Sequence, residues 1–231
     1  MKRVALIMAI IAPLLIAGSV EAALIHAGLG WPDIFSDQTG DYTYTYNAMT
    51  KTGLLTSTAV PQTIAFKDGT IVNVDPSKSY WVQFQLDGLG NFVGGHTAGG
   101  HTYDLEIYGN IDMNADGDYV DPGDYTGLLV GGDVTAFGWQ YDGNGYLQFD
   151  FLFDFQAGAL SAYYAEASNH GYDYATVEGT STYAGWDSAH KGKDKVKHDT
   201  APVPEASTLM LFGSGLSGLL FFARKKRLIK F

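Results

Sequence analysis

Apolar and polar residues alternate in several short runs along the middle of the chain. The clearest run is residues 147–155, in which Phe149, Phe151, Phe153 and Phe155 fall on one face. Further runs of this kind lie at residues 42–46, 80–87, 103–107 and 173–179. A period of two is typical of strands that bury one face and leave the other in solvent. The middle of the chain is therefore predicted to consist of antiparallel β-strands.

Turn signals between these runs set the fold class. Asp68-Gly69 is one of several Asp-Gly and Asn-Gly dipeptides that favour tight turns between strands. The one segment that favours a helix is short, at about residues 158–168. Short strands joined by such turns predict an all-β fold. We expect a single antiparallel β-sandwich, jelly-roll or Ig-like, over residues 23–186, with a barrel as the alternative.

Both ends of the chain hold an apolar segment beside basic residues. A short basic start, an apolar run and the small residues Val20 and Ala22 predict a signal helix over residues 1–22, which signal peptidase cuts after Ala22. At the other end, the apolar run 209–223 is followed by basic residues 224–227. This order predicts a transmembrane helix with its basic end in the cytoplasm, and a body that lies outside the cytoplasm.

The C-terminal segment also carries a motif. Residues 203–208 read Val-Pro-Glu-Ala-Ser-Thr, ahead of the apolar run and the basic tail. This order, which starts with Val203, Pro204 and Glu205, resembles a PEP-CTERM sorting signal over residues 203–231, although Ala206 stands where that family commonly has a second proline. The resemblance implies processing by exosortase, a membrane enzyme of Gram-negative bacteria that usually make exopolysaccharide. It also implies tethering to the inner membrane before processing, and then a place at the cell surface, in the outer membrane or in the extracellular matrix.

Charge is distributed unevenly along the chain. Residues 23–190 hold three lysines, no arginine and 21 carboxylates, a formal charge of −18. This balance argues against a nucleic-acid partner, and the absence of cysteine excludes thiol catalysis, disulfides and Cys-ligated metals. Four alternating lysines in residues 187–202 predict instead a flexible, exposed linker to the sorting signal. The excess of carboxylates in the body favours a bound cation.

Residues 112–124 hold the densest group of oxygen ligands in the chain. Carboxylate or amide groups at the first, third and fifth positions, and glycine at the sixth, reproduce the first half of an EF-hand-type Ca²⁺ loop. The predicted ligands are the side chains of Asp112, Asn114 and Asp116, the carbonyl of Asp118, and either Asp121 or Asp124. The loop also resembles those of dockerin-like proteins, but its twelfth position is Gly123 and no glutamate follows. The alternative is a solvated, Asp-rich turn without metal.

No sequence motif of a hydrolase, a phosphate-binding enzyme or a dinucleotide-binding enzyme is present, so the chain is predicted not to be an enzyme. The favoured function is an exported surface or extracellular-matrix protein, associated with exopolysaccharide or biofilm and stabilised by calcium. The alternative is a carbohydrate-binding or polysaccharide-hydrolysing β-sandwich protein. In that case Trp81 and Trp139 would stack on sugar rings, and Asp150 and Asp154 would be the candidate carboxylates.

Overall fold

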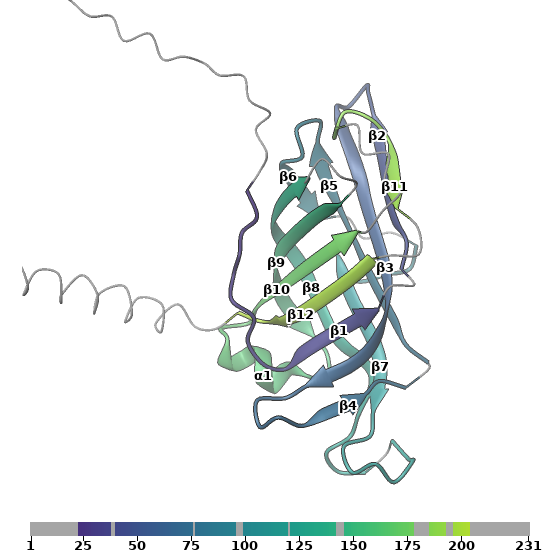
Figure 1. The fold of residues 1–231 in the computed structure, drawn as a ribbon, viewed down its shortest axis with the longest axis vertical. Helices are drawn as coiled ribbons and strands as arrows, with labels where there is room; N and C mark the ends of the chain where they lie inside the picture. The colour runs from purple at the N-terminus through teal and green to yellow at the C-terminus, as the bar shows by residue number, and fades with distance from the viewer. Residues whose placement is uncertain are drawn as a thin grey trace, which may run out of the picture.

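The computed structural model describes residues 23–37, 40–75, 77–95, 99–119, 121–141, 146–177, 185–192 and 196–203. Most regular structure in these residues is β-strand (Figure 1). The strands are β1 (Asp33–Asp37), β2 (Tyr42–Asn47), β3 (Thr52–Ala65), β4 (Ile71–Asn73), β5 (Ser79–Asp87), β6 (Phe92–Gly95), β7 (Leu105–Ile111), β8 (Tyr125–Tyr141), β9 (Leu147–Ala157), β10 (His170–Val177), β11 (His190–Gly192) and β12 (Val196–Pro202). A short helix, α1 (Ser161–Glu166), joins β9 to β10. The all-β part of the prediction is confirmed.

Eight of the described strands close into an antiparallel barrel. Around the ring the order is β3, β1, β12, β10, β9, β8, β7, β5 and again β3. The closure lies in β3, because its first half pairs with β5 and its second half pairs with β1. The remaining strands extend this ring: β2 and β4 pair with β3, β11 pairs with β2, and β6 pairs with β5.

The predicted β-sandwich, whether jelly-roll or Ig-like, is wrong. A sandwich has two separate sheets, whereas here one path of hydrogen-bonded strands returns to its start. The physical reason is the length and bending of the strands. β3, β8 and β9 have 14, 17 and 11 residues. β8 also shifts register against β9 at Gly131/Gly132 and at Val134/Ala136, and such bulges increase the twist that closes a sheet on itself.

Aromatic rings fill the inside of the barrel. Phe149, Phe151 and Phe153 are fully buried, as the alternation of residues 147–155 predicts. Phe84 of β5 packs against them from across the barrel, with its ring centroid 5.7 Å from that of Phe151 and 5.1 Å from that of Phe137. Each buried aromatic side chain removes roughly 150–250 Å² from water, so these rings are a main source of stability.

The described parts of residues 187–202 are not the flexible linker that the alternating lysines predict. β11 pairs with β2, and β12 lies between β1 and β10 as a member of the barrel. In β12, Lys197 is half-buried, and the inward residues Val196, His198 and Thr200 are fully buried. Of the four lysines, Lys191 lies in β11 and Lys197 in β12, and the other two lie outside the described residues. The barrel extends to Pro202.

The two terminal helices that the sequence predicts, in residues 1–22 and 209–223, lie outside the described residues. Within the described part of the chain, no helix combines the length and apolar character needed to cross a membrane, and α1 has six residues. Ahead of β1, residues 23–30 run in an extended path along the outside of the barrel (Figure 1).

Candidate functional sites

Residues 112–124 form the loop between β7 and β8, at the lower end of the barrel in Figure 1. Asp112 organises the first half of this loop. Its Oδ1 accepts hydrogen bonds from the amides of Asn114 and Ala115 at 3.1 and 2.5 Å, and its Oδ2 accepts one from the amide of Gly117 at 2.8 Å. The chain turns sharply at Gly117, whose φ of +93° is accessible to glycine at little cost.

Three carboxylates converge in the same loop. Asp116, Asp118 and Asp121 each offer one oxygen, and these oxygens lie within 4.8 Å of one another. The side-chain amide of Asn114 donates to Oδ2 of Asp116 at 3.2 Å and to Oδ2 of Asp121 at 2.9 Å. The backbone amide of Asp118 is the main cause that lowers the pKa of Asp116. A group of carboxylate oxygens of this kind fits a hard cation such as Ca²⁺.

The other two predicted carboxylate ligands hold the backbone of the loop. Asp112 bonds three amides, and Asp124 closes the base of the loop: its Oδ1 accepts from the amide of Met113 at 2.9 Å and its Oδ2 from that of Asp121 at 3.2 Å. Of the predicted ligand residues, the structure therefore gathers Asp116, Asp118 and Asp121, and Asp118 offers its carboxylate where its backbone carbonyl was predicted.

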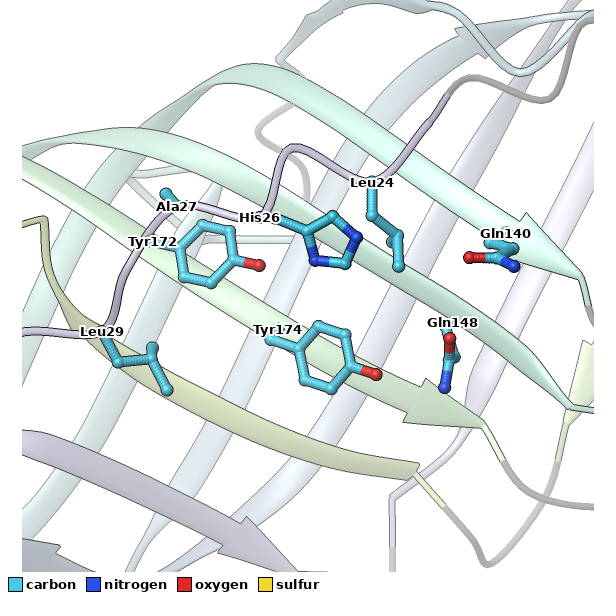
Figure 2. Close-up of a pocket in the computed structure, with 8 residues that line it drawn as sticks. All are labelled: Leu24, His26, Ala27, Leu29, Gln140, Gln148, Tyr172 and Tyr174. Carbon is cyan, nitrogen blue, oxygen red and sulfur yellow. The ribbon is translucent and has the colours of Figure 1, made fainter. Parts of the chain in front are cut away.

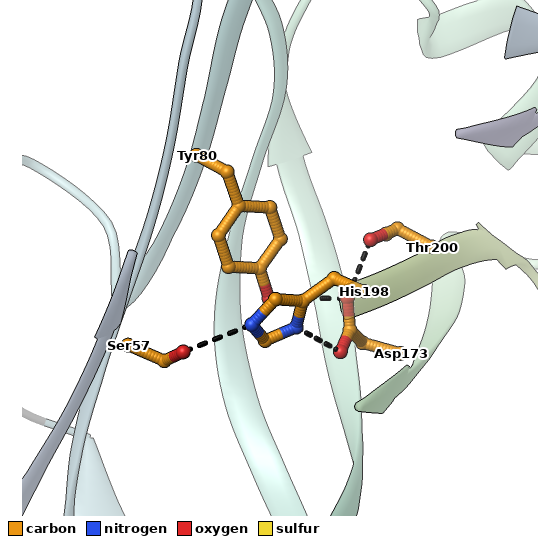
Figure 3. A network of polar contacts seen from close by, with 5 residues as sticks. All are labelled: Ser57, Tyr80, Asp173, His198 and Thr200. Carbon is orange, nitrogen blue, oxygen red and sulfur yellow. Dashed lines mark hydrogen bonds and ion pairs between the residues drawn. The ribbon is translucent and has the colours of Figure 1, made fainter. Parts of the chain in front are cut away.

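A hydrogen-bonded Ser–His–Asp series lies inside the barrel (Figure 3). Oδ1 of Asp173 is 2.8 Å from Nδ1 of His198, and Nε2 of His198 is 2.9 Å from Oγ of Ser57. Oδ2 of Asp173 accepts from the hydroxyls of Tyr80 at 3.0 Å and of Thr200 at 2.5 Å. The ring of Tyr80 stacks on the imidazole of His198, with the centroids 4.0 Å apart.

This series has the connectivity of a hydrolase triad without access for a substrate. Ser57, Asp173 and His198 are all 0% exposed. Burial, and then the carboxylate of Asp173, raises the pKa of Tyr80 well above its ordinary value, so the phenol stays a hydrogen-bond donor. A triad acts on a bond that its serine can reach. These groups are enclosed by the strands and form hydrogen bonds with one another. Their hydrogen bonds connect β3, β5, β10 and β12. The sequence offered no signal for them, because they come from separate strands.

Asp150 fastens residues 23–30 to the outer face of the barrel. This residue of β9 is fully buried beneath the segment. Its Oδ1 accepts from the amide of Ile25 at 3.0 Å, and its Oδ2 accepts from the amide of His26 and the hydroxyl of Tyr172, both at 2.9 Å. The carboxylate therefore has a structural set of partners.

Gly138 of β8 lets the same segment come close to the barrel. A β-carbon at this position would lie 2.5 Å from Oδ1 of Asp150 and 2.7 Å from the carbonyl oxygen of Ala23. Real β-carbons do not make such short contacts. The path of the segment thus depends on glycine at position 138.

A pocket of about 410 Å³ lies between this segment and strands β8, β9 and β10 (Figure 2). It is lined by Leu24, His26, Ala27, Leu29, Gln140, Gln148, Tyr172 and Tyr174. Gln140 and Gln148 stand opposite each other in the register of β8 and β9. The lining combines rings and amides with aliphatic groups, and it includes no carboxylate, lysine or arginine.

The two tryptophans predicted to bind sugars lie apart from this pocket and in different surroundings. Trp81 of β5 is half-buried, and its ring stacks on that of His101 with the centroids 3.6 Å apart. Trp139 of β8 is 4% exposed and packs edge-on against Trp186, with the centroids 5.4 Å apart. The structure therefore does not bring Trp81 and Trp139 together on one exposed face.

The candidate catalytic carboxylates also have separate partners. Asp150 binds the N-terminal segment, and Oδ1 of Asp154 is 2.8 Å from Nδ1 of His170 in an exposed pair. Glycoside hydrolysis requires two carboxyl groups on either side of a bound sugar. Neither Asp150 nor Asp154 lines the pocket.

The processing residues lie at the limits of the described chain. Ala22, Pro204 and Glu205 are outside it, whereas the amide of Val203 donates to the carbonyl of His170 at 3.0 Å, directly after β12. Residues 202–227 match the model of the PEP-CTERM protein-sorting motif. The chain matches no curated protein and no solved structure. It carries a PEP-CTERM sorting motif and is an exported protein that exosortase sorts to the cell surface.

Proposed function

We propose that the processed protein is a non-enzymatic component of the cell surface or extracellular matrix, associated with exopolysaccharide or biofilm. The observation that carries this proposal is the junction between the barrel and the sorting motif. The motif begins at Pro202, the last residue of β12, so the described barrel leads directly into it. Such an arrangement suits a protein whose folded body is itself the exported cargo. At the N-terminus, signal peptidase would remove residues 1–22 by cutting after Ala22.

The filled interior supports a role without catalysis. Phe84, Phe149 and Phe151 occupy the space in which a ligand-binding barrel would hold its ligand. The buried series of Ser57, His198 and Asp173 has no exposed atom with which to meet a substrate. A rigid, packed barrel favours a structural or binding role over turnover.

Calcium bound by residues 112–124 is the second part of the proposal. Three converging carboxylates within 4.8 Å supply the negative charge and the oxygen ligands that Ca²⁺ prefers. The cation would supply positive charge to a body that holds 23 carboxylates and seven lysines over residues 23–202. The hydrogen bonds of Asp112 to three backbone amides hold the first half of the loop in place for binding.

Cell fractionation tests the surface role. An epitope inserted at Met49, which is 92% exposed in the turn between β2 and β3, marks the protein without disturbing the barrel. We expect the tagged protein in the surface and matrix fractions of wild-type cells, and in the medium of cells that make no exopolysaccharide. The control is the Pro204→Ala, Glu205→Ala variant, which should stay with the inner membrane. An unchanged distribution in cells without exopolysaccharide would contradict the matrix association.

Calorimetric titration tests calcium binding. We expect Ca²⁺ to raise the melting temperature of the purified protein and a chelator to reverse the change. At a free concentration 100 times Kd, the gain is about 2.7 kcal/mol, or roughly 5–10 °C for a domain of this size. Asp116→Asn and Asp121→Asn should abolish the heat of binding, and Asp41→Asn, a change at another exposed aspartate, should retain it. Heat that persists in both loop variants would place the cation elsewhere.

A further inference from the structure

We propose that the pocket between residues 23–30 and strands β8, β9 and β10 binds an uncharged saccharide unit (Figure 2). Its volume of about 410 Å³ is within the range of small-molecule sites and leaves room for a mono- or disaccharide. A ligand entering from solvent would first meet His26 and Gln140, which are exposed, and then Tyr174 and Gln148, which are half-buried.

Two side-chain amides give the pocket its polar recognition. Gln140 and Gln148 face each other across the β8–β9 register. Within the described part of the chain, neither of these side-chain amides is engaged in a hydrogen bond. Each amide offers two N–H donors and one carbonyl acceptor. Neighbouring hydroxyls of a sugar are donors and acceptors in turn, so a pair of adjacent amides can bind both kinds of group.

Rings and aliphatic side chains provide the apolar surface. Tyr174 and His26 present flat rings at the pocket, and Leu24 and Leu29 line it from the N-terminal segment. The C–H face of a sugar ring is apolar and packs on such rings, while its hydroxyls remain free for the amides. Tyr172, which is fixed by its hydrogen bond to Asp150, forms a rigid part of the wall.

The pairing of the strands disfavours a peptide ligand. Each of β8, β9 and β10 has a neighbour on both sides in the barrel. An extended peptide binds by adding a strand to a free edge, where backbone groups await partners. On the three strands, recognition must therefore come from side chains. This favours a small ligand that is rich in hydroxyl groups.

Charge around the pocket favours a neutral ligand. Asp150 lies beneath the N-terminal segment, and Asp199 of β12 stands opposite Tyr174 in the register of β10 and β12. Lys197 is the nearest cation in this register, opposite Thr176. Residues 23–202, which include the whole barrel, hold 23 carboxylates and seven lysines, and this formal charge of −16 repels acidic glycans. The site depends on the proposed surface role for its access to polysaccharide, and it would give that role a molecular basis.

Titration of the purified, processed protein with defined oligosaccharides tests the site. The probes are maltohexaose, cellohexaose and mannohexaose as neutral chains, and hexagalacturonic acid as an acidic one. We expect saturation-transfer NMR and calorimetry to detect binding of at least one neutral chain. Tyr174→Leu and Gln148→Leu should each weaken this binding about tenfold, the loss expected for one hydrogen bond or ring contact. The control is Tyr108→Leu, a change at a tyrosine of β7 that is 38% exposed and outside the pocket.

Three outcomes would overturn the site: no neutral chain binds, both pocket variants bind as the wild type does, or the acidic chain binds more tightly. Melting curves of each variant show whether a loss of binding follows from unfolding, and Gln148→Asn, which keeps the amide, is the second variant for that case. Because the titration uses purified protein, a negative result leaves the fractionation result, and with it the surface role, unaffected.

Discussion

Two aspartates on β1 and β12 are held where their negative charges are unfavourable. Burial is the main cause that raises the pKa of Asp199 to about 6. The nearby carboxylates of Asp33 and Asp173 raise this pKa further, whereas His198 and Lys197 lower it. The pKa of Asp33 is also raised, first by burial and then by Asp173. A carboxyl group with a higher pKa in the folded chain binds protons more tightly there than in the unfolded chain. Folding is therefore favoured as the pH falls.

Asp199→Asn should remove this pH dependence. In the wild type, the contribution of Asp199 is complete below the unfolded pKa of about 4, and it is lost as the pH rises through a pKa of about 6. Urea unfolding should show the variant gaining stability relative to the wild type between about pH 4 and about pH 7. His190, whose pKa burial lowers to about 4, destabilises both proteins as the pH falls, so the informative quantity is their difference. A difference that is constant with pH would contradict the assignment to Asp199.

Two His–Asp pairs in this protein share the same Nδ1–carboxylate distance but differ in burial and in the number of further hydrogen bonds. Nδ1 of His198 lies 2.8 Å from Asp173 at 0% exposure, and Nδ1 of His170 lies 2.8 Å from Asp154 with the two side chains 59% and 46% exposed. Asp173→Asn should cost roughly 3–5 kcal/mol, because it removes a buried charge that accepts several hydrogen bonds. Asp154→Asn should cost about 0–1 kcal/mol. Urea unfolding of both variants measures the contrast, and equal costs would show that the interior series contributes no more than a surface pair.

A hydrogen-bonded group can be predicted from the sequence only where its members lie close together along the chain. The hydrogen bonds of Asp112 in the loop span two to five positions, so the spacing alone located the loop. The bonds of His198 to Ser57 and Asp173 span 141 and 25 positions. No short motif can indicate such a series, and only the register of the barrel strands brings it together.

Among the elements, β9 was predictable from the phenylalanines on its inward face, whereas β8 and β12 were not predictable from the sequence pattern. The run of residues 147–155 lies within β9. β12 was not predicted because two of its inward residues, His198 and Thr200, are polar, and both bind Asp173 inside the barrel. β8 was not predicted because glycines interrupt its alternation of apolar and polar residues. A β-carbon at Gly132 would lie 2.5 Å from the ring of Phe153, so a neighbouring side chain occupies that space.

The place of β12 in the barrel predicts how the chain tolerates shortening. A chain that ends at residue 203 should fold and unfold cooperatively, since it keeps every described strand. A chain that ends at residue 195 should not, because the ring opens between β1 and β10 and leaves Asp173 without His198 and Thr200. Near-ultraviolet circular dichroism and urea unfolding distinguish the two. If the shorter chain unfolds at the same urea concentration as the longer one, residues 196–202 are dispensable after all.

For the whole molecule, the local sequence pattern predicted an all-β fold but did not predict that the sheet closes into a barrel. Alternation with a period of two is the same in a sandwich and in a barrel, because both bury one face of each strand. Closure depends on β3, whose residues Thr52–Ala59 pair with β5 while its later residues pair with β1. That double pairing joins residues far apart in sequence and is decided by strand length, twist and bulges taken together.

The acidic body predicts a response to salt that differs from the response to calcium. With 23 carboxylates and seven lysines in residues 23–202, like charges repel across the barrel surface. Raising NaCl from about 10 mM to about 150 mM shortens the screening length from roughly 30 Å to 8 Å. This should raise the melting temperature by a few degrees in the wild type and equally in the Asp116→Asn, Asp121→Asn double variant.

Calcium chloride at the same ionic strength should raise the melting temperature further in the wild type alone, because only an intact set of residues 116, 118 and 121 adds a bound ion to general screening. Scanning calorimetry of both proteins in the two salts separates these effects. An identical gain from the two salts in the wild type would mean that the carboxylates act together as a diffuse charge, and that the loop has no preference for the divalent ion. A NaCl effect that disappears in the double variant would instead place most of the repulsion in the loop rather than over the barrel.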